Sequence, residues 1–323
     1  MGFVSGRKVK ILGTGIYVPE KVMYNSEFES FLDTSDTWIR ERTGIEKRHF
    51  AAKGQKCSDL AYLAALDVLK KTGLPVEKLD MIIIASNTPD SLIPCMASKV
   101  QGRLNAVNAG AYDLQAGCTG SLTAMQNAIM GIACGLWDNV LVIGSEAFEK
   151  IMDWSDRGTC ILFGDAAGAC ILSVADESEK QFFISAKLTA DGLKHDYITN
   201  ENNGDNEHNY LRMKGHDVFK YVSLNLPKFI NEFCSESKVD PTDVDFWVLH
   251  QANTRIIDGV FKRVGISTDR TLLNLGKYGN TSAASMLVAL DESYREGRIK
   301  RGEKVAFIAF GAGMTLGGLL YNA

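Results

Sequence analysis

The sequence predicts an α/β protein built from two similar halves, each with the order strand–helix–strand–helix–strand. Residues 80–88 (DMIIIASNT) and 245–253 (DFWVLHQAN) are short apolar runs of the kind that form buried parallel strands. Each is followed by a helical segment and then by a further apolar run, at residues 139–147 and 304–313. This alternation favours mostly parallel sheets that are covered by helices.

The spacing inside the two halves also indicates a duplication. Cys118 lies 38 residues after Asp80 in the first half, and Asn280 lies 35 residues after Asp245 in the second. Each of the two residues precedes a helical segment. Two similar halves that face each other would therefore bring Cys118 and Asn280 to matching places.

Polar stretches mark the boundary between the halves and one loop. The stretch 173–182 is polar, so we expect an N-terminal half of residues 1–175 and a C-terminal half of residues 176–323. The run 196–210 (DYITNENNGDNEHNY) has too few apolar residues to pack against a core, and it predicts a loop.

A helix is expected before the first strand of each half. Apolar residues recur at helical spacing in 59–71, and Ser58 is a suitable N-cap for that helix. The segment 217–237 has the same character in the second half. Pro227 lies inside it and should kink the helix or begin a new one.

Composition and charge exclude several classes of protein. The 323 residues are 46% hydrophobic and 23% charged, with a formal net charge of −4. This balance indicates neither a nucleic-acid-binding coat nor a disordered acidic tail. No apolar run reaches the roughly 18 residues of a membrane span, and the first residues lack the apolar core of a signal peptide. We expect a cytoplasmic protein without a nucleic-acid or membrane partner.

One cysteine differs from the rest in its setting. The seven cysteines are an odd number without a C-x-x-C pair, so they predict neither a disulfide framework nor a zinc site, and no other cluster has metal-binding spacing. Cys118 lies in AGCTGSL (116–122), a turn of small residues before a helix. The positive end of that helix would lower the thiol pKa below about 8.5 and favour a nucleophile. The other six cysteines are expected to be small buried hydrophobic residues.

His250 and Asn280 are the candidate companions of Cys118. His250 directly follows the apolar run DFWVL, and catalytic side chains gather at the carboxyl ends of parallel strands. Asn280 lies in the glycine-containing turn YGNTSAAS (278–285). A lone His or Asn is more often structural, and their occurrence with Cys118 is what marks them as candidates.

The motifs AGCTGSL, HQAN, YGNTSAAS and FGAGMTLGG together resemble β-ketoacyl-acyl-carrier-protein synthase III, a condensing enzyme of the thiolase fold. Residues 34–50 (TSDTWIRERTGIEKRHF) and 155–169 (SDRGTCILFGDAAGA) are also similar to that family. The six motifs occur in the family's order, from about residue 8 to the C-terminus. The resemblance implies a thiolase-like fold, in which duplicated βαβαβ halves form a layered αβαβα architecture, and a homodimer that needs no cofactor.

The resemblance also implies a reaction, the decarboxylative Claisen condensation that initiates fatty acid biosynthesis. Cys118 would take the acyl group from a short acyl-CoA primer. His250 and Asn280 would donate hydrogen bonds to the malonyl thioester of malonyl-acyl-carrier protein (malonyl-ACP), and the products would be 3-oxoacyl-ACP, CO₂ and CoA. The backbone N–H groups of Cys118 and Ala312 would stabilise the tetrahedral oxyanion.

Three further sets of residues match binding positions of the family. The residues implied to bind CoA are Trp38, Arg42, Arg157 and Asn253. A basic set is implied to receive the acidic carrier protein and consists of Lys220, Arg255, Lys262 and Arg263. Two residues are implied to shape the primer pocket, namely Phe310 and, reaching across the dimer interface, Ile93, which precedes Pro94.

Other functions remain open at this point. The order Cys, His, Asn also occurs in papain-like proteases, although these usually have a secretory history and disulfides. A hydroxymethylglutaryl-CoA synthase would need a catalytic Glu in a matching motif, and none is identified. A condensing enzyme of secondary metabolism and a non-catalytic paralogue that only binds carrier protein are the remaining alternatives.

Overall fold

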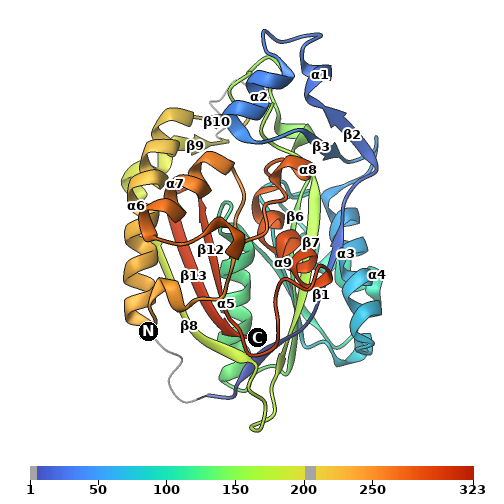
Figure 1. Ribbon diagram of the computed structural model, residues 1–323. Helices are drawn as coiled ribbons and strands as arrows, with labels where there is room; N and C mark the ends of the chain where they lie inside the picture. Colours follow the sequence, from blue (N-terminus) through green and yellow to red (C-terminus); the bar gives the residue numbers. More distant parts are fainter. Residues whose placement is uncertain (1–5, 201–208) are drawn as a thin grey trace.

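The computed structural model describes residues 6–200 and 209–323, whose longer strands form two mixed sheets (Figure 1). The first sheet has five strands, in the order β1 (Val9–Tyr17), β7 (Ala166–Val174), β6 (Asn139–Glu146), β4 (Met81–Ala85) and β5 (Gly110–Leu114). Strand β4 is parallel to β5 and β6, whereas β7 is antiparallel to both of its neighbours.

The second sheet repeats this arrangement. Its four strands lie in the order β8 (Phe182–Ala190), β13 (Thr315–Asn322), β12 (Lys304–Gly311) and β11 (Phe246–Leu249). Strand β11 is parallel to β12, and β13 is antiparallel to both of its neighbours. Trp247 of β11 also forms a single parallel bridge with Thr271, at the position that β5 occupies in the first sheet. Both strand order and strand direction therefore agree with a duplication.

The prediction of mostly parallel sheets is wrong. Two of the four strand pairs in the first sheet and two of the three in the second are antiparallel. Strands β12 and β13 are joined by residues 312–314 alone. So short a connection can only join antiparallel neighbours, because a parallel pair needs a crossover of a dozen or more residues.

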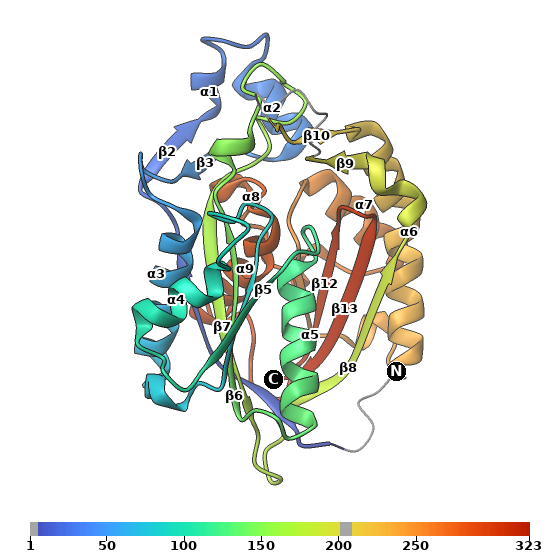
Figure 2. The ribbon, with the colours of Figure 1, turned by 180° about the vertical axis from the view of Figure 1, so that it is seen from behind.

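Helices cover both faces of both sheets and give five layers. Two helices lie between the sheets, α5 (Gly120–Ala133) and α9 (Ser285–Arg295), and they share one buried cluster with both sheets. The outer face of the first sheet carries α3 (Cys57–Thr72) and α4 (Met96–Leu104). The outer face of the second carries α6 (Gly215–Glu236) and α7 (Thr254–Val264). Figure 2 shows α5 between the sheets, and the predicted αβαβα layering is confirmed.

One local prediction about a helix needs correction, namely the N-cap of α3. Helix α3 begins at Cys57 with Lys56 as its N-cap, because the Asp59 carboxylate accepts from the Lys56 N–H at 2.7 Å. Ser58 is therefore inside the helix, where its hydroxyl donates to Asp90 at 2.6 Å.

Helix α6 runs through Pro227, so no new helix begins there, and a kink at this residue stays our prediction. Proline has no N–H with which to bond the carbonyl four residues before it, which is that of Ser223. The Arg263 guanidinium of α7 donates to this carbonyl instead. A neighbouring helix therefore satisfies the group that Pro227 leaves without its helical partner.

Short elements form a cap over one end of the sheets, at the top of Figure 1. They are β2 (Lys21–Tyr24), α1 (Asn25–Phe28), α2 (Asp36–Thr43), β3 (Lys47–Phe50), β9 (Ile198–Thr199), β10 (Arg212–Met213) and α8 (Leu275–Tyr278). The predicted loop 196–210 contributes β9, which pairs with β10, while its residues 201–208 lie outside the described part of the chain.

Two further predictions concern the boundary and the cysteines. Strand β7 of the first sheet ends at Val174, and β8 of the second sheet begins at Phe182. The division of the chain into two halves near residue 175 stays our prediction. The expectation of buried cysteines is wrong for Cys134, which is exposed at the end of α5, and Cys95 is half-buried. None of the helices in the described part of the chain is long and apolar enough to cross a membrane.

Candidate active site

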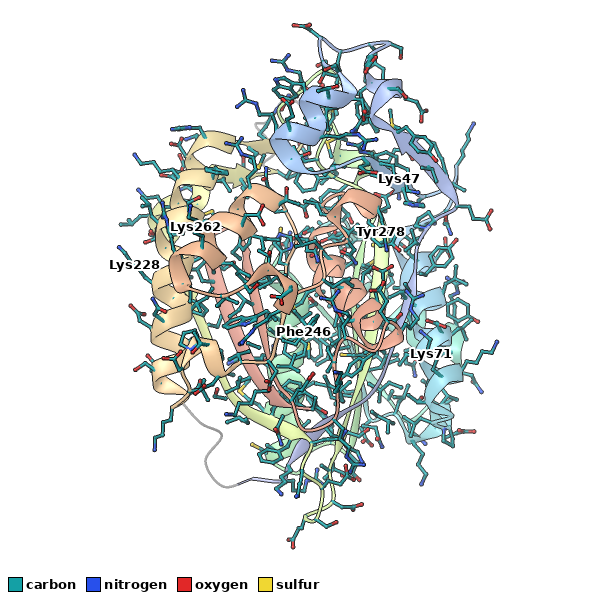
Figure 3. The ribbon with its side chains drawn as sticks, in the orientation of Figure 1. Lys47, Lys71, Lys228, Phe246, Lys262 and Tyr278 are labelled. Atoms are coloured by element: carbon teal, nitrogen blue, oxygen red, sulfur yellow. The ribbon has the colours of Figure 1, made fainter. Side chains whose placement is uncertain are left out.

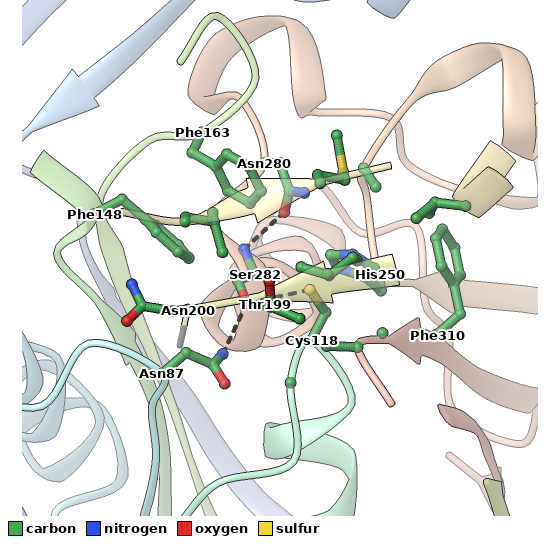
Figure 4. Close-up of a pocket in the computed structure, with 18 of the residues that line it drawn as sticks. Asn87, Cys118, Phe148, Phe163, Thr199, Asn200, His250, Asn280, Ser282 and Phe310 are labelled. Atoms are coloured by element: carbon green, nitrogen blue, oxygen red, sulfur yellow. Dashed lines mark hydrogen bonds between the residues drawn. The ribbon is translucent and has the colours of Figure 1, made fainter. Parts of the chain in front are cut away.

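Cys118, His250 and Asn280 line one cavity of about 160 Å³, although they are far apart in the sequence. Cys118 lies between β5 and α5, and His250 directly follows β11. Asn280 precedes a short 3₁₀ turn, Ser282–Ala284, that leads into α9. Each side chain therefore comes from a strand end or a helix start, and the three point into the same space (Figure 4).

The chemistry of Cys118 differs from the sequence prediction. Helix α5 does begin two residues after it, at Gly120. However, Cys118 is half-buried in the wall of the cavity, and desolvation of its sulfur raises the pKa of the thiol to about 12, with a smaller increase from the charge of Glu146. A hydrogen bond of 3.2 Å from the Ser282 hydroxyl to the sulfur opposes the increase only in part. The predicted lowering of the thiol pKa by the helix is therefore wrong.

His250 is held as a neutral ring. It is 1% exposed, and burial lowers its pKa to about 3. The Phe310 ring packs edge-on against it with 4.9 Å between ring centroids. Its Nδ1 lies 2.6 Å from the Ser285 hydroxyl oxygen, which in turn lies 2.9 Å from the Ser282 carbonyl oxygen. The single proton of Ser285 can serve either of these two acceptors.

Asn280 is fixed through both its backbone and its side chain. Its N–H donates to the Leu162 carbonyl at 2.8 Å, and its carbonyl accepts from the Gly164 N–H at 3.1 Å. Its side-chain oxygen accepts from the Ser282 N–H at 2.8 Å. The NH₂ end of the amide is therefore turned away from Ser282 and is available as a donor (Figure 4).

Two backbone segments meet closely at the nucleophile. Gly117 has a φ of +57°, and a Cβ placed on it would lie 2.9 Å from the Ala312 nitrogen. A Cβ on Gly311 would lie 2.6 Å from the Cys118 nitrogen. Glycine at both positions lets the turn after β12 contact the Cys118 segment, and both Cys118 and Ala312 line the same cavity.

A second cavity of about 380 Å³ leads from this site toward the cap. Asn280 and Phe310 line both cavities. Trp38, Arg42, Arg157 and Asn253, the four residues expected to bind CoA, all line the second one. The Trp38 ring has the Arg157 guanidinium at 4.9 Å and that of Arg42 at 5.9 Å from its centroid. The Asn253 amide caps α7 and donates to the Arg42 carbonyl at 2.9 Å.

The basic set lies on the α6–α7 side of the molecule, where Lys262 is visible in Figure 3. Its four members, Lys220, Arg255, Lys262 and Arg263, are all exposed. The Arg255 guanidinium lies 5.7 Å from the ring of Phe219, which lines the second cavity. Arg263 is the member with an internal partner, the Ser223 carbonyl of α6.

The two predicted primer-pocket residues are placed very differently. Phe310 is 4% exposed and lines both cavities. Ile93 is 89% exposed beside Leu92, which is 94% exposed, and it lines neither cavity of its own chain. A role for Ile93 in a partner's pocket stays a prediction.

Sequence reasoning missed the polar residues that surround the three candidates. Ser282 and Ser285 belong to the same YGNTSAAS turn as Asn280, so their position beside it was a usable signal. Asn87 follows an apolar strand and Glu146 ends one, and the sequence around them carries no local signal of their role. Glu146 is fully buried, and burial raises its pKa. Among the described residues, no three His, Cys, Asp or Glu side chains are grouped to hold a metal ion.

Comparison with known proteins agrees with this geometry. The family described as 3-oxoacyl-[acyl-carrier-protein (ACP)] synthase III matches residues 112–192, and its C-terminal counterpart matches residues 234–323. The β-ketoacyl-[acyl-carrier-protein] synthase III of Xanthomonas campestris pv. campestris (strain 8004) is 41% identical over 318 residues, which cover 96% of this chain and 97% of that protein.

Solved structures give the same result. The crystal structure of 3-oxoacyl-[acyl-carrier-protein] synthase III from Aquifex aeolicus VF5 is 37% identical, with a TM-score of 0.92 over 98% of this chain and all of that one. The priming β-ketosynthase of the R1128 polyketide pathway is similar at 27% identity and a TM-score of 0.92, over 100% of this chain and 98% of that one. The two duplicated sheets, the shared Cys–His–Asn cavity and these full-length similarities show that the chain belongs to the β-ketoacyl-[acyl-carrier-protein] synthase III family.

Proposed function

We propose that the protein condenses a short acyl-CoA primer with malonyl-ACP and so begins fatty acid synthesis. In the first step the Cys118 sulfur bonds to the acyl carbon, the bond from that carbon to the CoA sulfur breaks, and the thiol proton ends on CoA. In the second step malonyl-ACP loses CO₂, the resulting enolate carbon bonds to the acyl carbon, and the bond from that carbon to the Cys118 sulfur breaks, so that the released thiolate takes up a proton and the thiol is restored. The products are 3-oxoacyl-ACP, CO₂ and CoA.

The observation that carries the proposal is the pair of adjoining cavities. The inner cavity holds the nucleophile and the candidate donors, and the outer one holds the aromatic and guanidinium groups expected at a nucleotide. The Trp38 ring, with two guanidinium groups close to it, suits an adenine, because a flat ring and a cation both stack on a π-face. The path between the cavities suits the pantetheine arm that links a nucleotide to its thioester.

The state of His250 supports a donor role in decarboxylation. A neutral imidazole donates through one nitrogen only. If the Ser285 hydroxyl donates to Nδ1, the proton of the ring lies on Nε2, which would then point a hydrogen bond at the malonyl thioester oxygen. The NH₂ group of Asn280 would be the second donor. Two fixed donors stabilise the negative charge that develops on that oxygen as CO₂ leaves.

The oxyanion of the condensation step would be held by backbone groups. We infer that the N–H groups of Cys118 and Ala312 are its donors, because both line the inner cavity in closely packed turns. Backbone donors held in this way need no reorganisation as charge develops. Ala312 does not have to be glycine for this role, because any residue but proline supplies the N–H.

The partners and the setting follow from the same proposal. The basic set is exposed on α6 and α7, its member Arg255 lies next to Phe219 of the outer cavity, and the set suits an acidic carrier protein. We infer a homodimer in which the exposed Ile93 enters the partner's primer pocket. A cytoplasmic location and the absence of a cofactor remain part of the proposal.

Acylation by labelled acetyl-CoA tests the proposed first step. Wild-type protein should retain one labelled acetyl group at Cys118, which peptide mass mapping would locate, and it should release CoA. The Cys118→Ser variant should retain none, because a serine hydroxyl has no dedicated base here. Label on another residue, or none on wild-type protein, would overturn the nucleophile assignment.

A further inference from the structure

Ser282 contacts Cys118 and Asn280 directly and reaches His250 through Ser285, and it uses a different group for each (Figure 4). Its hydroxyl donates to the Cys118 sulfur at 3.2 Å, and its N–H donates to the Asn280 side-chain oxygen at 2.8 Å. Its carbonyl oxygen lies 2.9 Å from the Ser285 hydroxyl, which contacts His250. Ser282 is 2% exposed, so these contacts are shielded from bulk water.

The backbone of Ser282 has an uncommon conformation. Its φ is +48°, in the left-handed region that residues with a Cβ seldom adopt. Among the described residues, the other non-glycine residues with positive φ are Asn105 and Lys238, which follow the ends of helices, where this conformation is common. Ser282 instead lies ahead of a helix. Such strain persists only where the surroundings enforce it, and it concentrates at functional sites.

The Ser282 hydroxyl is directed at the sulfur by a chain of buried groups. The Asn87 amide donates to the Ser282 hydroxyl oxygen at 3.1 Å and to a Glu146 carboxylate oxygen at 2.6 Å. Glu146 also accepts from the Thr88 hydroxyl at 2.7 Å and from the Asn87 N–H at 3.0 Å, which holds this loop in place. Because Asn87 donates to the serine oxygen, the serine proton is free to point at Cys118.

We propose that Ser282 is a positioning residue that stabilises the negative charge on the Cys118 sulfur during acyl transfer, with Asn87 anchored on Glu146 to aim its hydroxyl. The proposal rests on the proposed function. The serine proton is not transferred: the thiol proton leaves with CoA, and Ser282 keeps its own. Glu146 and His250 are the titratable groups beside the sulfur, but among the described residues it is the Ser282 hydroxyl that donates a side-chain hydrogen bond to it.

Alkylation of Cys118 by iodoacetamide tests the proposal without any substrate. The measurement uses protein in which the exposed Cys134 and the half-buried Cys95 are changed to serine, followed by peptide mass mapping. Ser282→Ala should slow alkylation of Cys118 about ten- to hundredfold at every pH from 7 to 9, the range expected for loss of a hydrogen bond to a charged group. Asn87→Ala should have a smaller effect in the same direction. Ser293→Ala is the matched control, since Ser293 is another buried serine, and its hydroxyl donates to the Ala289 carbonyl within α9.

Two further measurements separate positioning of the sulfur from a merely structural role. Ser282→Gly removes the same hydroxyl but relieves the strained backbone, so it should be as slow as Ser282→Ala if the hydroxyl matters. Decarboxylation of malonyl-ACP should fall far less than alkylation in Ser282→Ala, because the N–H that orients Asn280 is retained. The proposal would be overturned if Ser282→Ala were alkylated at the wild-type rate, or if it lost alkylation and decarboxylation equally. It would also be overturned if Ser282→Gly regained the wild-type alkylation rate. A wild-type protein that is alkylated normally but not acylated by acetyl-CoA would contradict the proposed function instead.

Discussion

Gly144→Ala should move the turn that carries Ser282 away from the nucleophile. Gly144 lies within β6, and a Cβ placed on it would be 2.2 Å from the Ala283 carbonyl oxygen and 2.8 Å from its carbonyl carbon. Ordinary contact begins at 3.4 Å, so Ala283 would have to retreat by about 1.2 Å. A shift of that size in Ser282 would break its 3.2 Å contact with the Cys118 sulfur. We expect a loss of about 10² in kcat/KM and of about 1–3 kcal/mol in the free energy of unfolding.

The assays are condensation of acetyl-CoA with malonyl-ACP and urea unfolding, with activity expressed per folded molecule. Gly102→Ala is the matched control, because Gly102 lies in α4 with nothing within 4 Å of the added Cβ. Alanine there should leave activity unchanged and should raise stability by up to about 1 kcal/mol. Wild-type activity in folded Gly144→Ala protein would refute the reasoning, since it would show that the turn adapts without disturbing the site.

Three further predictions test single parts of the site. Because burial raises the Cys118 pKa to about 12, its alkylation rate should rise about tenfold per pH unit from pH 7 to 10; a plateau below pH 9 would contradict this. His250→Ala and Asn280→Ala should still be acylated but should lose on the order of 10²–10³ in malonyl-ACP decarboxylation, and failure at acylation alone would reverse the assigned roles. Ile93→Ala should favour longer primers in an acyl-CoA series, by about 0.8 kcal/mol per buried methylene; an unchanged ranking would make Ile93 ordinary interface packing.

The three candidate catalytic residues could be predicted because their local sequence carries the signal. Cys118 and Asn280 occupy turns of small residues before helices, and His250 follows an apolar strand. The duplication could be predicted for the same reason, since strands and helices recur at similar spacing in both halves. That duplicated two-sheet fold also removes the papain-like alternative, whose only support was the order of Cys, His and Asn.

The supporting residues could not be predicted, because contacts between distant parts of the chain decide them. Asn87 meets Ser282 across 195 positions in the sequence. Glu146 ends an apolar strand, and nothing in that strand indicates that its carboxylate turns inward to accept hydrogen bonds from Asn87. The predicted direction of the Cys118 pKa shift was wrong for a related reason, because desolvation of the sulfur, which depends on the folded chain, outweighs a local rule about helix starts.

The central helical layer has a consequence for synthesis of the protein on the ribosome. Helix α5 ends at Ala133 and its partner α9 begins at Ser285, 152 residues later in the chain. The inner face of the first sheet, with Leu122, Met125 and Ile129 of α5, is covered by groups of the second half. A nascent chain therefore exposes a large apolar surface until its last elements emerge, and such surfaces favour aggregation. Newly made chains should depend on chaperones until the C-terminal strands are released.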